Sequence, residues 1–211
     1  MISDGKPILD ACCGSRMFWF DKDNPFVEFM DIRDEEVYLS DGQLCIVHPN
    51  TIGDFTAMPF PDSSFKMVVF DPPHLVWAGK AANLYKRFGC LNKDWKEELT
   101  MGFNECFRVL EPYGVLIFKW CETQLKLKTV LALTREKPLF GHKRGKTFWV
   151  AFMKIPNTPP PWVITGNSPF LCFLLVRVAC KRYPLFVEKI MQKNALFAKK
   201  ITKKLAYIID Y

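Results

Sequence analysis

The sequence predicts an α/β protein with a mostly parallel sheet, an antiparallel sheet edge and a basic helical C-terminal tail. Short apolar runs rich in Val, Ile and Phe alternate with loop or helical stretches along the first 155 residues. Such runs, without strict alternation, are typical of strands buried on both faces of a parallel sheet. At 211 residues the chain has room for one domain and an appendage, but not for two full domains.

The elements follow from the hydrophobic pattern. Over residues 94–110, apolar side chains recur at spacings of three and four after early acids, which predicts an amphipathic helix. Two apolar runs flank the basic loop "GHKRGK" (141–146), which predicts an antiparallel hairpin and therefore a mixed sheet edge. The runs expected to form strands are residues 7–13, 26–32, 44–49, 66–73, 114–120 and 147–155.

A proline-rich run, "IPNTPPPW" (155–162), ends this pattern. Consecutive prolines cannot donate to a strand ladder and favour an extended linker. We therefore predict a domain over residues 1–155, followed by a linker and a basic amphipathic tail of two helices over residues 156–211. The first tail helix has an apolar run of about a dozen residues that contains Arg177, against the roughly 20 residues that a membrane span needs.

The net charge of +7 lies entirely in the tail, because residues 156–211 carry 9 Lys and Arg against 2 Asp and Glu, whereas residues 1–155 balance at 20 each. The basic balance is therefore no evidence that the main domain binds nucleic acid. None of the eight cysteines forms a C-x-x-C pair, so neither a metal site nor a disulfide framework is expected. The first residues, "MISDGKPILD", show no secretion signal, and we expect a cytoplasmic protein.

The first candidate motif is "ILDACCGS" (8–15), an acid at the end of a strand followed by small residues. A strand that turns in this way into a helix presents free backbone N–H groups at the carboxyl edge of a sheet, where α/β proteins bind ligands. The G-x-G-x-x-G fingerprint is absent, which argues against a dinucleotide. Asp31 ends the next strand 17 residues after Gly14, close to the spacing at which an acid binds a ribose.

The second motif is "FDPPH" (70–74), directly after a buried strand. Each proline fixes its φ angle and removes a donor, so the strand end presents rigid acceptors, the Asp71 carboxylate and the Pro72 carbonyl. An amino group on a base or a side-chain amide has a delocalised lone pair, and two acceptors on its N–H bonds would localise that pair toward an electrophile. The alternative is a plain strand-terminating turn.

Together these motifs resemble class I S-adenosylmethionine-dependent methyltransferases, and among them the amino-methyltransferases with a D/N-P-P-Y/F/W motif. Small phage-type enzymes with "DACCGSRMFW" and "DPPH" have the most similar pattern, over about residues 7–155. The resemblance implies a Rossmann-like sandwich, S-adenosyl-L-methionine as cofactor, and methyl transfer to an exocyclic amino nitrogen, adenine N6 in DNA or RNA. It implies a catalytic set of Asp71, Pro72, Pro73 and His74, and cofactor contacts from Asp10, Ala11, Cys12, Gly14, Asp31, Asp54 and Phe55.

The chain departs from this family at several points. A second glycine usually stands near Arg16, and His74 replaces the aromatic residue that stacks on a flipped base. Only 39 residues separate Asp31 from Asp71, so a target-recognition domain has no room there and specificity must come from short loops.

Residues 74–89 interleave aromatic and basic side chains, which favours base stacking and phosphate contact over a plain solvated loop. Residues 141–146 form a basic hairpin tip, which is either a phosphate contact or a plain solvated loop. Alternatives to nucleic acid are a protein amide, a small-molecule amine, or a catalytically weak cofactor-binding module that docks through the tail. The candidate substrate contacts are Trp77, Lys80, Lys86, Arg87, His142, Lys143 and Arg144.

Overall fold

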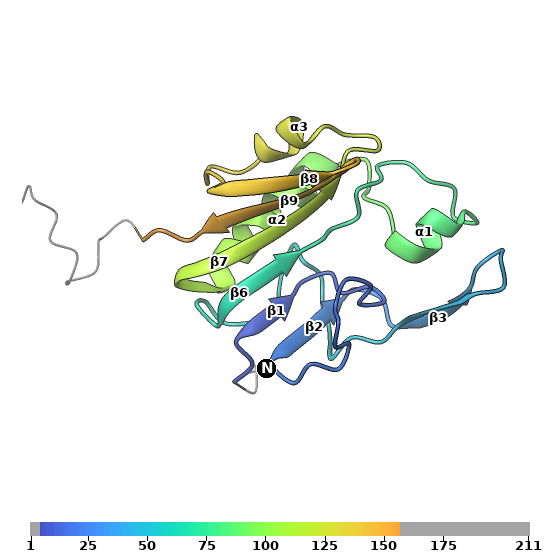
Figure 1. Cartoon of the computed structure of the whole chain (residues 1–211), viewed down its shortest axis with the longest axis horizontal. Coiled ribbons are helices and arrows are strands. Elements are labelled where there is room, and N and C mark those ends of the chain that lie inside the picture. Colours follow the sequence, from blue (N-terminus) through green and yellow to red (C-terminus); the bar gives the residue numbers. More distant parts are fainter. Residues whose placement is uncertain (1–4, 157–211) are drawn as a thin grey trace, which may run out of the picture. The chain divides into compact units, whose positions relative to one another are not determined.

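A computed structural model describes residues 5–156 of the chain (Figure 1). The predicted tail helices lie outside the described residues. Within residues 5–156, no helix is both long and apolar enough to cross a membrane.

Seven strands in the described part of the chain form the main sheet: β1 (Ile8–Asp10), β2 (Val27–Asp31), β5 (Thr51–Ile52), β6 (Phe65–Phe70), β7 (Leu110–Cys121), β8 (Phe140–Arg144) and β9 (Thr147–Met153). Their order is β5-β2-β1-β6-β7-β9-β8. The first five run parallel, whereas β9 is antiparallel to both β7 and β8. The predicted fold class, a mostly parallel Rossmann-like sheet with an antiparallel edge, is confirmed.

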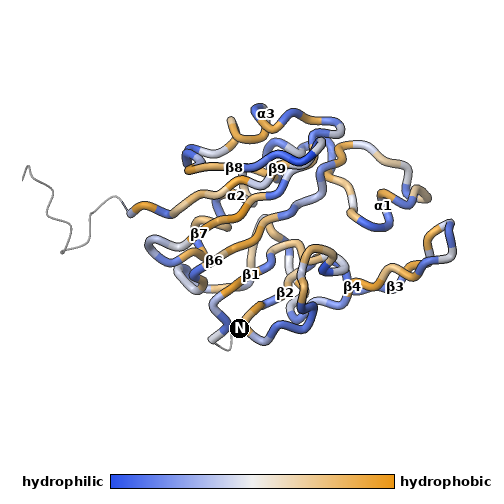
Figure 2. Tube along the Cα trace, viewed as in Figure 1, coloured by the Kyte–Doolittle hydropathy of each residue, from blue (hydrophilic) through white to orange (hydrophobic). Residues whose placement is uncertain are grey.

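The predicted helix is α2 (Trp95–Val109), which crosses from β6 to β7 along one face of the sheet (Figure 1). Its buried Phe103 packs on Phe70 and Phe118, with ring centroids 5.6 and 5.0 Å apart. Hydrophobic residues concentrate along the central strands that α2 covers (Figure 2). Two short helices were not predicted, α1 (Asn83–Phe88) and α3 (Leu127–Leu131).

The prediction that residues 44–49 form a strand of the main sheet is wrong. Residues Leu44–Val47 are β4, which pairs with β3 (Glu35–Tyr38) in a separate antiparallel hairpin that extends beyond β2 (Figures 1 and 2). Side chains of β4 alternate between exposed and buried, as expected for a strand with one solvated face. The two-residue strand β5 takes the place beside β2.

Two further expectations need correction. Burial alternates along most of β7, so its second face is only half-buried rather than fully enclosed. No helix follows β1 either, since residues 11–26 form turns. In this loop Trp19 packs edge-on against Phe29 at 5.4 Å, and Phe18 against Trp149 at 5.3 Å. Aromatic side chains of this loop thus pack on residues of β2 and β9.

Candidate active site

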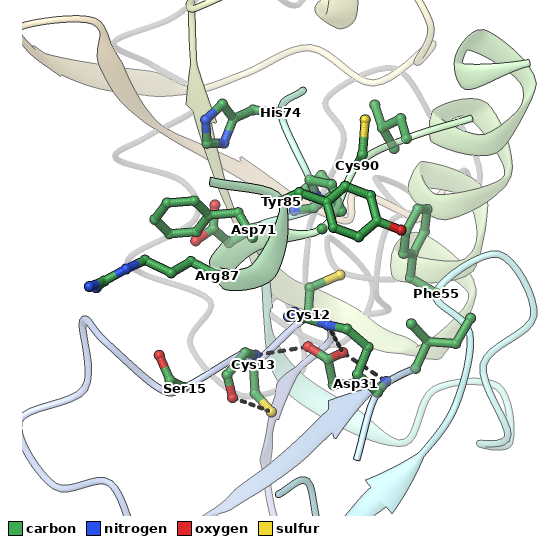
Figure 3. A pocket seen from close by; sticks show the side chains of 18 of the residues that line it. Cys12, Cys13, Ser15, Asp31, Phe55, Asp71, His74, Tyr85, Arg87 and Cys90 are labelled. Atoms are coloured by element: carbon green, nitrogen blue, oxygen red, sulfur yellow. Dashed lines mark hydrogen bonds and ion pairs between the residues drawn. The ribbon is translucent and has the colours of Figure 1, made fainter. Parts of the chain in front are cut away.

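A cleft of about 830 Å³ opens at the carboxyl ends of the parallel strands. Its volume lies within the range of about 300–1,000 Å³ that is usual for ligand sites. The loop after β1, the ends of β2 and β6, the segment after β5 and helix α1 all contribute lining residues. Figure 3 shows Asp31 and Phe55 bordering the same cleft as Asp71, His74 and Tyr85. Both sequence motifs therefore meet at one site.

The loop after β1 is fixed to the end of β2. Gly14 has a φ of +49°, a conformation that glycine adopts without a steric penalty. Its N–H donates to Oδ2 of Asp31 over 2.9 Å. A side chain at this position would meet only the Arg33 guanidinium, 3.8 Å away, so the backbone of Gly14 is open on the side of the cleft.

Arg16 stands near the position where the loops that this one resembles usually have a second glycine, and it adopts the left-handed conformation, with a φ of +54°. This conformation costs a non-glycine residue roughly 1 kcal/mol or more. The Arg16 guanidinium donates to the carbonyl oxygens of Lys22 (2.5 Å) and His48 (2.6 Å) and lies 4.0 Å from the centroid of the Phe29 ring. These contacts offset the backbone strain, so the turn keeps its shape without the glycine.

Asp31, the expected ribose acid, is already partly engaged. In addition to the Gly14 bond, its Oδ1 accepts hydrogen bonds from the backbone N–H and the Nε of Arg33, at 3.0 and 3.2 Å. A carboxylate offers about four lone-pair sites. One site therefore stays available on Oδ2, and a ligand with two hydroxyls would have to replace an Arg33 bond to use both oxygens.

Asp10 does not line the cleft, which corrects its predicted role as a cofactor contact. It is fully buried, and its Oδ2 accepts a 2.7 Å hydrogen bond from the indole Nε1 of Trp19. Burial raises the pKa of Asp10 to about 7, although the Trp19 bond opposes this rise, and the nearby Asp71 and Asp31 carboxylates add to it. Asp10 thus holds the loop after β1 in place through Trp19.

Asp54 and Phe55 line the cleft next to Asp31. Oδ1 of Asp54 accepts hydrogen bonds from the backbone N–H and the hydroxyl of Thr56, both at 2.8 Å, which holds the turn after β5. The ring of Phe55 packs against Phe70 with centroids 5.4 Å apart. This end of the cleft therefore combines an apolar ring with two carboxylates, Asp31 and Asp54.

Asp71 lies at the end of β6 and forms an ion pair through its Oδ2 with Lys119 of β7. Burial raises the pKa of Asp71 above its ordinary value, and the Lys119 ammonium opposes this shift. Within residues 5–156, Oδ1 of Asp71 has no hydrogen-bond partner, yet no fully buried side-chain oxygen or nitrogen is unpaired. Oδ1 must therefore be accessible from the cleft.

His74 follows the two prolines and borders the cleft with Phe88 of α1, their ring centroids 5.7 Å apart. Burial and the nearby Lys119 charge lower the pKa of His74, which favours the neutral imidazole. The segment beyond it is anchored by Gln124, whose Oε1 accepts from the N–H groups of Val76 (2.8 Å) and Trp77 (3.0 Å).

The candidate substrate contacts fall into two groups. Lys80, Lys86 and Arg87 line the cleft, but Lys86 Nζ donates to the carbonyl of Tyr38 and an Arg87 nitrogen to Gln43 Oε1. Both therefore hold α1 against the β3–β4 hairpin. The other predicted contacts do not line the cleft. Trp77 is 78% exposed, and the remaining three lie on the exposed strand β8: His142, Lys143 and Arg144.

Sequence reasoning missed Lys119, Arg33 and Phe88, which all line the cleft. Lys119 could have been found, because it is the single charged residue in the apolar run "GVLIFKW" (114–120). Arg33 follows Asp31 by two residues without any pattern that marks it. Phe88 depends on α1, whose short sequence has no strong helical period.

The cysteines near the site behave as packing residues. Burial raises the pKa of the Cys13 thiol to about 12 and that of Cys12 well above its ordinary value, which argues against either as a nucleophile. Among residues 5–156, no three His, Cys, Asp or Glu side chains are placed to hold a metal ion.

No protein-family model and no curated protein matches the chain. Solved structures similar to it include a SAM-dependent methyltransferase from Methanosarcina mazei, at 13% identity over 70% of this chain and 92% of that one, with a TM-score of 0.45. The N-methyltransferase NodS from Bradyrhizobium japonicum is 11% identical over 71% of this chain and 85% of its own, with a TM-score of 0.41. At such low values these similarities decide nothing about activity, which has to be derived from the cleft.

The raised pKa of Asp10 predicts a pH-dependent stability. Asp10 is protonated in the folded protein up to about pH 7 but ionises near its ordinary value of 3.8 in the unfolded chain, so its contribution is full below pH 4 and is lost as the pH rises through 7. Asp10→Asn cannot ionise and should escape this loss. Urea unfolding should show that the free energy of unfolding of the variant, relative to that of the wild type, rises by on the order of 2–4 kcal/mol between pH 4 and pH 8. A pH-independent difference would show that Asp10 is not the titrating group.

Proposed function

We propose that this protein is an S-adenosylmethionine-dependent methyltransferase that methylates an exocyclic amino nitrogen of a nucleobase, adenine N6 in DNA or RNA. The observation that carries the proposal is the Asp71 carboxylate, rigidly placed by two prolines, with Oδ1 open to a cleft that Asp31 also borders. All residues named for this activity lie within the predicted domain of residues 1–155.

The residues of the cleft fit the cofactor. The open backbone at Gly14 suits close approach of its methionine part, and the free lone-pair site on Asp31 suits a ribose hydroxyl. Phe55 offers a flat apolar surface and Asp54 an acceptor for an adenine ring. When bound, the cofactor supplies an electrophilic methyl group.

The other end of the cleft suits a planar, uncharged amine. Asp71 Oδ1 can accept one amino N–H and so localise the lone pair on the nitrogen, while Oδ2 stays with Lys119. A carboxyl group whose pKa is raised by burial is also a stronger base, and Oδ1 can take the proton that the nitrogen loses after methylation. The neutral His74 imidazole and the Phe88 ring provide surfaces for a flat ring.

The charge of the site separates the alternatives. Lys119 neutralises Asp71, so this carboxylate offers no net negative charge to an aliphatic ammonium. A nucleobase amine and a side-chain amide are both neutral and planar. Trp77, which is exposed, and Lys80, which follows it by three residues and lines the cleft, favour the nucleobase, since an aromatic ring can stack on neighbouring bases and a lysine can contact a phosphate.

The substrate class can be tested with radiolabelled S-adenosylmethionine and pools of DNA, RNA and denatured protein. We expect label in nucleic acid, and mass spectrometry of the digested nucleosides should find N6-methyladenine. Label in protein alone would support the side-chain amide instead. Cofactor binding without transfer to any pool would support a binding module and contradict the proposed activity.

Asp31 should determine cofactor affinity. Asp31→Asn removes a charged acceptor and should weaken S-adenosylhomocysteine binding about tenfold or more, which corresponds to the roughly 1.5–3 kcal/mol of a hydrogen bond to a charged group. Titration calorimetry would measure this loss. Asp34→Asn, at an exposed acid outside the cleft, serves as the matched control and should bind as the wild type does. Equal affinities of all three proteins would contradict the role of Asp31.

Asp71 should matter for transfer rather than for cofactor binding. Asp71→Ala removes the amine acceptor and should lower the single-turnover rate by on the order of 10²–10³ with nearly unchanged S-adenosylhomocysteine affinity. Asp71→Asn keeps one acceptor oxygen and should retain more activity than Asp71→Ala. A rate within about tenfold of the wild type in Asp71→Ala would exclude Asp71 as the acceptor.

A further inference from the structure

Lys119 is a charged residue in an otherwise apolar run (114–120), and its side chain has three specific contacts there. It lies on β7, paired in register with Trp149 of β9, and its ammonium contacts the Asp71 carboxylate. The same ammonium lies 5.4 Å from the ring centroid of Phe18 and 5.7 Å from that of Trp149. One carboxylate and two aromatic rings thus hold a cation that is only 25% exposed.

Holding a lysine in this position has a cost, because an ammonium loses hydration when it is buried. A hydrophobic residue would suit a strand of this kind better. The aromatic faces stabilise the cation, and the rings themselves are packed edge to face, 5.3 Å apart. The loop after β1 supplies Phe18, so the loop that borders the cleft also builds the lysine site.

We propose that Lys119 is the positioning residue of the "DPPH" motif: it holds Asp71 by Oδ2, directs Oδ1 at the substrate amine, and excludes cationic amines from the site. This inference rests on the proposed function. A carboxylate is a rigid planar group, so an ion pair that fixes one of its oxygens also fixes the direction of the other. The orientation of Oδ1 is therefore set before a substrate arrives.

The second consequence of the ion pair is the protonation state of Asp71. The titratable groups around Asp71 are Lys119 from β7, Asp10 from β1, Cys12 from the following loop and His74 from its own segment. Only Lys119 favours the ionised carboxylate. Without it, burial alone would act on Asp71, and the carboxyl would keep its proton to a higher pH.

The test uses three variants of the full chain. Lys119→Met removes the charge and keeps the length of the side chain, Lys119→Gln keeps a donor for Asp71 without the charge, and Lys119→Arg keeps the charge. The control is Lys96→Met, which removes a lysine that lies 5.5 Å over the Trp95 ring outside the cleft. S-adenosylhomocysteine calorimetry should give the same affinity for all five proteins and so establish that each is folded.

The first measurement is the carboxyl titration of Asp71 by NMR with ¹³C-labelled aspartate, assigned with Asp71→Asn and Asp10→Asn. We expect the titration to move up by about 1–3 pH units in Lys119→Met and Lys119→Gln. Lys119→Arg and Lys96→Met should titrate as the wild type does. An unchanged titration in Lys119→Met would overturn the proposal, and this readout does not depend on any methyl transfer.

The second measurement is the pH profile of single-turnover transfer to an adenine-containing oligonucleotide. In Lys119→Met the acid limb of this profile should lie at a higher pH than in the wild type, by the same interval as the Asp71 titration. In Lys119→Arg it should lie where it does in the wild type. A merely structural role would instead lower the rate equally at every pH. A moved titration with an unmoved limb would also overturn the proposal. If the wild type transfers no methyl group to any substrate, the proposed function fails, and the titration still decides whether Lys119 keeps Asp71 charged.

The exclusion of cations is tested with methylammonium chloride as an inhibitor, against potassium chloride at equal ionic strength. At a pH above the Asp71 titration of the variant, where Asp71 is ionised in both proteins, methylammonium should inhibit Lys119→Met at a concentration at least tenfold lower than it inhibits the wild type. Equal inhibition of both proteins would remove charge exclusion from the proposal.

Discussion

Three carboxylates at the ends of three adjacent parallel strands are the constraint on which this site depends. Asp10 ends β1, Asp31 ends β2, and Asp71 follows β6, and the order β2-β1-β6 brings them to one edge of the sheet. Like charges at such a place raise one another's pKa, as Asp71 and Asp31 do for Asp10. Each carboxylate has a different partner, and the partner determines what the carboxylate can do.

The three partners give the carboxylates different roles: Asp10 is a buried support for the loop after β1, and Asp31 and Asp71 mark the two ends of the cleft. Trp19 donates a hydrogen bond to Asp10 from a neutral indole, so this acid stays buried and lies beneath the loop. Arg33 and the Gly14 N–H hold Asp31 but leave one lone-pair site on Oδ2. Lys119 holds Asp71 by one oxygen and leaves the other open. Of these three carboxylates, Asp31 and Asp71 line the cleft, and each keeps an acceptor site that a ligand can occupy.

Much of the fold was predictable because β6, β7, β9 and α2 carry strong hydrophobic patterns over six or more residues. Residues 44–47 were expected in the main sheet because "LCIV" is apolar throughout, and no polar residue marks the face that the structure leaves exposed at Leu44 and Ile46. The expected helix after β1 was also wrong, since Arg16 and Trp19 stabilise a turn through contacts with distant residues. The cleft residues contributed by α1 depend on side-chain bonds to the hairpin, which no local pattern encodes.

Arg33 shows how the two ends of the cleft are connected. Its backbone N–H and Nε donate to Asp31, and its Nη1 donates to the carbonyl of Lys86 in the last turn of α1, 3.1 Å away. The same helix presents Tyr85 and Phe88 to the cleft, and Asn83 exchanges hydrogen bonds with Ser40 beyond β3. A ligand that takes the second oxygen of Asp31 would compete with the Arg33 bonds to that oxygen, and Arg33 is also an anchor of α1. Because binding at one site can change another only through a difference in such contacts, Arg33 is the physical link by which occupancy of the Asp31 end would alter the aromatic wall at the Asp71 end.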